Sequence, residues 1–191
     1  MKNLFSVFVF LVILVVFTAD VNAQKEDGDR VGGIRLGWHQ SAFYNDGNAI
    51  SDADPMQSFY VGFFRDNKVI PMLHFGSGLE YYQNGINYAG DNKLALHYVS
   101  VPLNLKLKLG PVFALTGFAP SFKVAERIVT DGNSVKPSDD LVSEWFDVPF
   151  LLGAGVKILF ITIEARYHWG LLEVNDGLNS RYFQLGAGLS F

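Results

Sequence analysis

Residues 182–191 of the chain read Tyr-Phe-Gln-Leu-Gly-Ala-Gly-Leu-Ser-Phe. Every second side chain is apolar, from Phe183 to the terminal Phe191, and the side chains between them are small or polar. A period of two over this length predicts a β-strand with one apolar face. A closing strand of this kind, ending on an aromatic residue, is typical of a transmembrane β-barrel.

The first 23 residues are expected to be a cleaved signal peptide. Lys2 supplies a positive charge, residues 4–18 are almost wholly apolar, and Val21-Asn22-Ala23 forms a small-residue cleavage site. An uncleaved membrane anchor is the alternative, but the apolar run is short for a spanning helix and no basic flank follows it. We therefore expect residues 24–191 to form a single domain that begins at Gln24.

Composition excludes several classes of protein. The chain has no cysteine, which removes disulfides, a lipid-modified N-terminal cysteine, thiolate metal sites and cysteine nucleophiles. Its net charge is −4 and it has no basic run, so nucleic acid is not an expected partner. The 19 glycines, 17 phenylalanines and 8 tyrosines suit β-structure with tight packing and interfacial aromatic residues.

Alternating apolar and polar residues recur in eight segments. They cover residues 31–43, 58–65, 70–82, 94–109, 112–122, 145–157, 160–169 and the terminal strand. The connections 44–57, 83–93, 123–144 and 171–180 are long and polar, whereas those at 66–68, 110–111 and near 158 are short. This alternation predicts an all-β fold, an eight-stranded antiparallel up-and-down transmembrane β-barrel with both ends in the periplasm. Pro102 lies inside the fourth segment, where it indicates a bulge or an unpaired position.

Ionisable residues occupy the polar face of these segments near the strand centres. A polar barrel interior accommodates such residues while the apolar faces contact lipid. Eight strands leave an interior that side chains fill, so the charges are expected to pair with one another as structural groups. A proton or ion path is the alternative. The expected lumen charges are Arg35, Glu80, Lys106, Asp147, Lys157, Glu164 and Arg166.

Large aromatic residues gather near the loop-side ends of the expected strands. Such residues form girdles at membrane interfaces, although ordinary core residues are the alternative interpretation. The expected interfacial aromatic residues are Trp38, Tyr81, Tyr98, Trp145, Tyr167 and Trp169, together with Phe191 at the C-terminus.

No catalytic, cofactor or metal site is expected. Ser100 and His97 are close in sequence, but strand alternation directs their side chains to opposite faces, and no Gly-x-Ser-x-Gly elbow is present. His39, His97 and His168 map to external strand ends, where a metal site is the alternative, but strand alternation directs His97 outward and interfacial or solvated histidines are expected. The acidic residues Asp131, Asp139, Asp140 and Glu144 match no calcium-binding loop.

Three segments resemble one family. Residues 98–106, Tyr-Val-Ser-Val-Pro-Leu-Asn-Leu-Lys, resemble a strand of the PorT-like outer-membrane β-barrel proteins, as do Gly153-Ala154-Gly155-Val156-Lys157 and the segment 166–171. One departure is Ser100, which stands where the family usually has an acid. The resemblance implies a small outer-membrane barrel, and one branch of the family serves a protein secretion apparatus.

The expected protein is therefore a barrel in the outer membrane of a Gram-negative bacterium, with a structural or interaction role. Its expected partners are outer-membrane lipid, the barrel-assembly machinery through the C-terminal strand, and a protein bound at loops 44–57 and 123–144. Two alternatives come from other classes. One is a lipocalin-like periplasmic or secreted barrel that binds an apolar ligand, which requires apolar residues inside. The other is a membrane-embedded lipid-modifying enzyme, whose first candidate residues are His97 and Ser100.

Overall fold

The computed structural model describes residues 30–45, 48–49, 53–88, 93–130, 133–135, 145–175 and 178–191. The expected signal peptide, the expected mature start at Gln24 and the acidic residues Asp131, Asp139, Asp140 and Glu144 lie outside the described residues. Within the described ranges, no helix has the length and hydropathy needed to span a bilayer.

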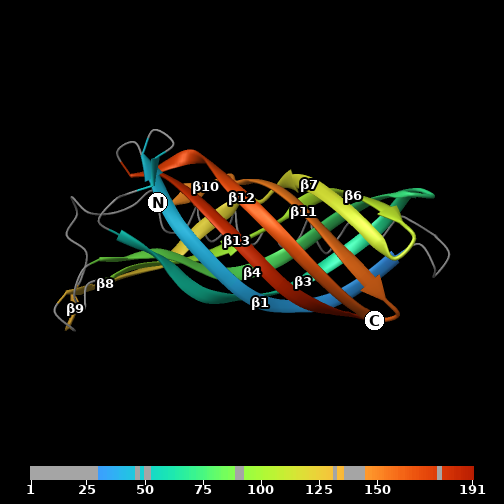
Figure 1. Ribbon diagram of the computed structural model, residues 1–191, viewed down its shortest axis with the longest axis horizontal. Coiled ribbons are helices and arrows are strands. Elements are labelled where there is room, and N and C mark those ends of the chain that lie inside the picture. Colours follow the sequence, from blue (N-terminus) through green and yellow to red (C-terminus); the bar gives the residue numbers. More distant parts are fainter. Residues whose placement is uncertain are drawn as a thin grey trace, which may run out of the picture.

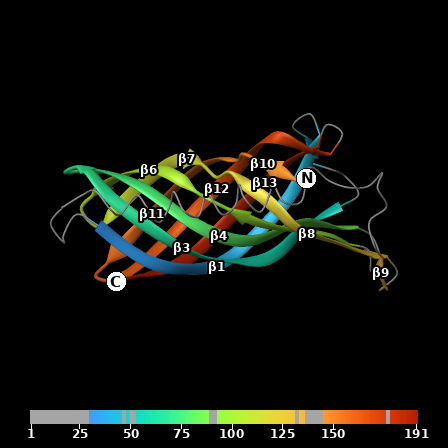
Figure 2. The ribbon, with the colours of Figure 1, turned by 180° about the vertical axis from the view of Figure 1, so that it is seen from behind.

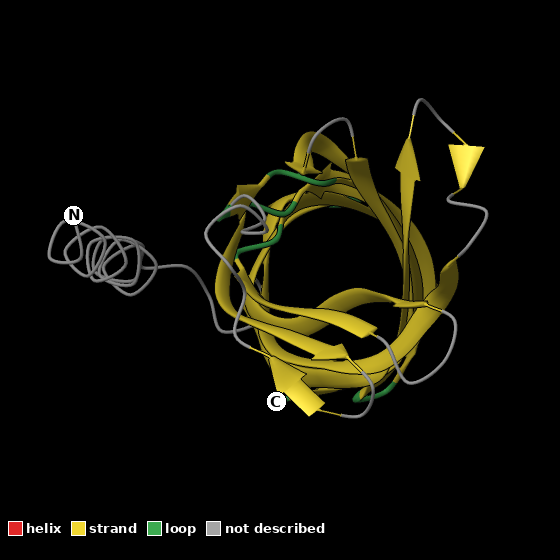
Figure 3. Ribbon diagram, turned by 90° about the vertical axis from the view of Figure 1, so that its left-hand side faces the viewer, coloured by secondary structure: helices red, strands yellow, loops and turns green. Residues whose placement is uncertain are grey.

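The strands close into one ring of eight positions, and all pairings are antiparallel (Figures 1 and 3). Three positions are single strands that follow one another: β1 (Arg30–Asn45), β3 (Ala53–Ile70) and β4 (Leu73–Tyr88). Three are interrupted: β5 (Lys93–Ser100) with β6 (Leu103–Leu109), β7 (Val112–Phe118) with β8 (Ser121–Thr130), and β10 (Phe146–Asp147) with β11 (Phe150–Ile158). The last two are β12 (Ile161–Asn175) and β13 (Leu178–Ser190), and β13 pairs with β1 to close the ring.

Two short strands lie outside this ring. β2 (Asn48–Ala49) pairs with the end of β1, and β9 (Asn133–Val135) pairs with the end of β8. Both are at the end of the barrel opposite the chain's C-terminus, which is also visible from behind in Figure 2. The eight predicted strands are therefore present, and several of them extend further into the expected loops than the sequence pattern indicated.

Side chains alternate between lumen and exterior along each strand. In β6, Leu103, Leu105 and Leu107 are exposed, whereas Asn104 and Lys106 between them are buried. Such alternation follows from the strand period of two, because successive Cβ atoms leave opposite faces of the sheet. The polar face of most predicted strands points into the barrel, which is the reverse of a soluble apolar-ligand barrel, although β7 places Phe113 and Leu115 inside.

Three prolines interrupt neighbouring strands at one level of the wall. Pro102 separates β5 from β6, Pro120 separates β7 from β8, and Pro149 separates β10 from β11. Proline has no N–H, so each of these residues removes one hydrogen bond from the ladder. The sequence indicated the first interruption, but not the other two.

Single backbone hydrogen bonds bridge these interruptions. The Val101 N–H donates to the Pro120 carbonyl at 2.8 Å, and the Ala119 N–H donates to the Pro149 carbonyl at 2.9 Å. The Ser121 hydroxyl donates to the Ala119 carbonyl at 2.6 Å and so replaces the donor that Pro149 lacks. The wall therefore keeps its register across the prolines.

The three short turns share the end of the barrel where the C-terminus lies. They contain Pro71-Met72, Gly110-Pro111 and Leu159-Phe160. The predicted turn at residues 66–68 is wrong, because β3 continues to Ile70 and Asp66 pairs with Gly76 in the ladder. Leu159 adopts a φ of 55°, a left-handed conformation that allows the turn after Ile158 to form without glycine.

Candidate functional site

The middle of the lumen holds a closed ring of four charged side chains. Arg35 extends from β1, Glu80 from β4, and Glu164 and Arg166 both extend from β12. Arg35 Nε lies 2.6 Å from Glu80 Oε1, and Arg35 Nη1 lies 2.8 Å from Glu164 Oε1. Arg166 Nη1 lies 2.8 Å from Glu80 Oε1, and its Nε lies 3.4 Å from Glu164 Oε1. The ring is neutral overall and links opposite walls of the barrel.

Aromatic rings cover the two guanidinium groups. The Arg166 Cζ lies 5.0 Å from the centre of the Tyr60 ring, and the Arg35 Cζ lies 5.2 Å from that of Phe64. A Cβ atom at Gly186 would overlap the Tyr60 hydroxyl, so glycine at that position leaves the space that the ring occupies. Charge pairing and cation–π contacts together compensate the burial of these ions.

A second charge cluster lies toward the short turns. Lys106 Nζ contacts both carboxylate oxygens of Asp66, at 3.0 and 2.8 Å. Lys108 Nζ lies 3.5 Å from the same carboxylate. Asp66 was assigned to a turn by the sequence pattern, which missed it as a lumen charge because the segment Asp66-Asn67-Lys68 has turn-like composition.

Histidine and tyrosine side chains fill the lumen toward the long loops. His39 and His168 were expected at external strand ends, but both are buried inside the barrel. His168 stacks on Tyr182 with ring centroids 4.2 Å apart, and His39 lies 4.9 Å from the same ring. The Tyr182 hydroxyl donates to that of Tyr82 at 3.3 Å.

Asp147 forms hydrogen bonds between strands rather than an ion pair. Its carboxylate accepts hydrogen bonds from the Ser180 hydroxyl at 3.0 Å and from the backbone N–H groups of Val148 and Leu172, at 2.7 and 3.4 Å. The described ladder between β11 and β12 ends at Phe150 and Trp169. Beyond the end of this ladder, the Asp147 side chain links β10 to β12 and β13 by hydrogen bonds.

The barrel exterior carries a belt of exposed apolar side chains. Examples spread around the ring are Leu36, Phe63, Leu105, Leu152 and Ile163, each between 48% and 62% exposed. A monomeric soluble protein rarely exposes an apolar surface of this extent, whereas in a membrane the acyl chains of lipids cover it.

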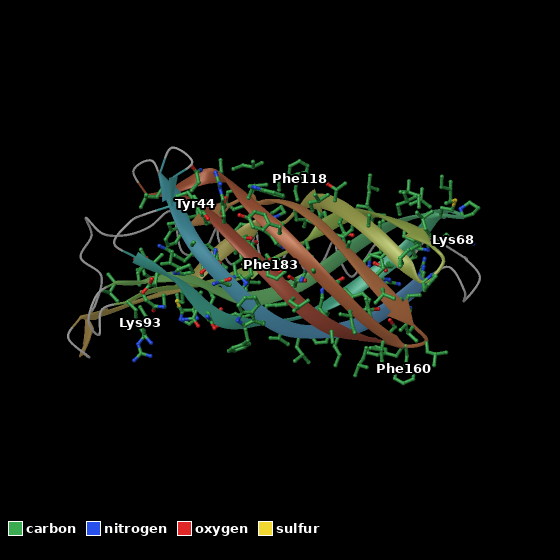
Figure 4. All side chains as sticks on the ribbon, viewed as in Figure 1. Tyr44, Lys68, Lys93, Phe118, Phe160 and Phe183 are labelled. Atoms are coloured by element: carbon green, nitrogen blue, oxygen red, sulfur yellow. The ribbon has the colours of Figure 1, made fainter. Side chains whose placement is uncertain are left out.

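Five of the seven predicted interfacial aromatic residues lie on the outer face among the loop-side group. Trp38, Tyr81, Trp145, Tyr167 and Trp169 lie on the outer face, and Tyr167 and Trp169 contact each other with centroids 4.5 Å apart. Figure 4 shows Tyr44 and Lys93 at the loop end and Phe160 and Lys68 at the opposite end.

Tyr98 does not belong to this girdle. It is 2% exposed and its ring stacks on Tyr82 at 5.5 Å, because even-numbered residues of β5 face the lumen. Phe191 follows the last strand at the short-turn end, away from the loop-side group.

Catalytic and metal-binding groups do not converge in the described part of the chain. Ser100 is buried in the lumen, whereas the His97 ring contacts the Tyr81 hydroxyl at 2.6 Å on the outer face. No group of three or more potential metal-ligating side chains occurs among the described residues. Lys157 points into the lumen near the short turns. The other six expected lumen charges are buried at various depths of the lumen.

Residues 22–175 match the model of the outer membrane protein β-barrel domain family. The chain belongs to this family. This membership and the belt of exposed apolar residues place it in the outer membrane of a Gram-negative bacterium, where lipid surrounds it. No curated protein sequence matches the chain.

Solved outer-membrane barrels share its fold. The attachment invasion locus protein Ail of Yersinia pestis is 17% identical, with a TM-score of 0.52, covering 85% of this chain and 99% of Ail. Neisserial surface protein A is 12% identical, with a TM-score of 0.56, covering 84% of this chain and 97% of that protein. At this identity the likeness concerns the fold alone.

Proposed function

We propose that this outer-membrane barrel is an interaction protein whose loop end binds a partner with a positively charged surface. The four long connections predicted from the sequence carry eleven acidic and four basic residues, a net charge of −7. The whole chain has a net charge of only −4, so negative charge is concentrated at this end. Charge complementarity of this kind steers partners and excludes those of like charge.

The lengths of the strands support a binding role for the loop end. β3, β4, β5 and β8 continue beyond the level at which β11 and β12 stop pairing, and Figure 1 shows β8 reaching the far end of the molecule. Strand pairing holds a projecting surface in place better than a free loop does. The lumen offers less support for a transport role, because the ring of Arg35, Glu80, Glu164 and Arg166 crosses it with side chains 1–4% exposed.

The partner that we expect differs in charge from the ligand of one structural neighbour. Ail has been crystallised with sucrose octasulfate, a heparin analogue and a polyanion. An end with eleven acidic residues repels such a ligand, so we expect this protein to prefer a cationic surface.

The test uses the full mature protein in lipid nanodiscs and two soluble probes, an oligo-arginine peptide and sucrose octasulfate. We expect salt-sensitive binding of the peptide and none of the polyanion. The triple change Asp139→Asn, Asp140→Asn and Glu144→Gln should weaken peptide binding at least threefold. A matched control removes three acids near the N-terminus, Glu26, Asp27 and Asp29. Equal weakening by both variants, or binding of the polyanion, refutes the proposal.

The resemblance of residues 98–106 to the PorT-like proteins supports a more specific version, in which the partner belongs to a secretion apparatus. A strain that lacks this gene should then lose particular secreted proteins while its outer membrane stays intact. The alternating C-terminal strand likewise supports recognition by the barrel-assembly machinery, and Phe191→Ser should then lower the amount of folded barrel in the membrane. An unchanged set of secreted proteins contradicts the secretion role. An unchanged amount of folded barrel contradicts recognition of the C-terminal strand.

A further inference from the structure

Lysine side chains gather inside the barrel at its short-turn end. Lys106, Lys108 and Lys157 all face the lumen there, from β6 and β11. Asp66 is the only acidic side chain at this end among the described residues, and it contacts both Lys106 and Lys108. Lys157 lies close enough to Lys108 to act on it electrostatically, and it has no ion pair within the described part of the chain. Two ammonium groups therefore share the Asp66 carboxylate, and that of Lys157 lies near them without a carboxylate partner among the described residues.

The turns that surround these lysines are apolar and exposed. Turn residues of soluble proteins are usually Gly, Pro, Asn, Asp and Ser. Here each of the three short turns carries large apolar side chains at or beside its tip, and the C-terminal residue continues the pattern. The residues are Val69, Ile70, Met72, Leu109, Val112, Ile158, Leu159, Phe160 and Phe191, between 48% and 86% exposed.

Exposed apolar tips on three unrelated turns indicate an apolar environment that extends to the end of the barrel. Leu159 is the clearest case, because it is 83% exposed at the tip of the turn in which it adopts a left-handed conformation. If the tips lie among acyl chains, the lipid headgroups lie at or beyond them. The headgroups then cover the mouth of the lumen, where Lys108 and Lys157 are, and Lys106 lies deeper, at 4% exposure.

We propose that the short-turn end is embedded in the periplasmic leaflet and that Lys108 and Lys157 bind the phosphate of an anionic phospholipid, while the buried Lys106 stays paired with Asp66. Lysine binds phosphate as a point charge, and a phosphodiester supplies the negative charge that Asp66 alone does not. The apolar tips select a lipid over a soluble anion, because they contact its acyl chains. The opposite end is acidic, so this site is independent of the partner surface proposed there.

The first experiment measures lipids retained by the purified mature protein. The protein in detergent is mixed with equal amounts of phosphatidylglycerol and phosphatidylcholine of the same chain length, and bound lipid is counted by native mass spectrometry. We expect at least threefold more phosphatidylglycerol. The double change Lys108→Gln and Lys157→Gln should abolish this preference, and Lys108→Arg with Lys157→Arg should retain it. The matched control removes two lysines of the long connections expected from the sequence, Lys93→Gln and Lys136→Gln, and should change nothing.

Competition with inorganic phosphate distinguishes lipid from free anion. Retention of phosphatidylglycerol in millimolar phosphate supports the proposal, whereas displacement by phosphate, or equal retention of both lipids, overturns it. Folding of each variant is checked by the mobility shift on heating.

A second measurement tests the depth of the turns without removing any lysine. The change Leu159→Trp should add fluorescence that lipids with brominated acyl chains quench. Fluorescence that these lipids leave unquenched, with emission typical of water, overturns the embedding of this end.

Discussion

Replacing Arg166 by methionine tests the charge ring most directly. Arg166 makes three contacts with carboxylate oxygens, two with Glu80 at 2.8 and 3.2 Å and one with Glu164 at 3.4 Å. Its side chain is 1% exposed, so water does not compensate their loss. Methionine has a similar length but no charge. In the variant, Arg35 alone must balance two buried carboxylates.

The magnitude follows from the unpaired charge. Removing one partner from a buried ion pair costs about 3–5 kcal/mol, because the remaining ion stays desolvated. The ratio of folded to unfolded protein then falls by roughly 10²- to 10⁴-fold. The double variant Arg166→Met with Glu80→Gln restores neutrality, because Arg35 and Glu164 remain as a pair. Its loss should be about 2 kcal/mol smaller than the sum of the two single losses.

The assay is urea unfolding of the protein in lipid vesicles, followed by tryptophan fluorescence and by the heat-dependent gel mobility of the folded barrel. Lys93→Met is the matched control, because Lys93 is exposed at the start of β5, and it should change stability by less than about 0.5 kcal/mol. A loss below about 1 kcal/mol for Arg166→Met, or additive effects in the double variant, would refute the closed ring as a coupled unit.

Three further substitutions and one mass measurement test other parts of the protein. Leu36→Arg places a charge on the lipid face, and vesicle unfolding should show a loss of about 2–4 kcal/mol if the residue lies near the midplane. Gly186→Ala puts a methyl group into the space of the Tyr60 hydroxyl and should cost about 1–3 kcal/mol in the same assay. Ser121→Ala removes a buried hydroxyl that both donates and accepts, and should cost about 1–3 kcal/mol. Intact mass of the protein from outer membranes should correspond to a chain beginning at Gln24 and not at Met1.

The sequence predicted the existence and facing of the strands better than their limits. The alternation that ends at Phe191 identified lumen and lipid faces, because the side-chain period of a strand depends only on local geometry. Strand ends depend on pairing with a neighbour, which local sequence does not encode. For this reason β3 continues through Asp66 to Ile70, and β8 continues to Thr130 within an expected loop.

The sequence predicted that the lumen charges pair with one another, but not which residues form each pair. The contact between Glu164 and Arg166 could be expected from their spacing on one strand. The contact of Lys106 with Asp66 joins residues 40 positions apart, and no pattern within either segment indicates it. The predicted interfacial position of Tyr98 is wrong, because even-numbered residues of β5 face the lumen and its side chain is buried there.

The period of two, the polar interior, the alternation of long and short connections and the acidic charge of the long ones can all be derived from the amino-acid sequence. These properties are local or additive along the chain. Three other features depend on how the strands pair in space. They are the identity of the charges that meet, the hydrogen bonds that bridge the three aligned prolines, and the position of the lysines of β6 and β11 at the same end of the lumen. Closure of the ring brings together residues from strands distant in sequence, and the free energy of burying each charge depends on that arrangement.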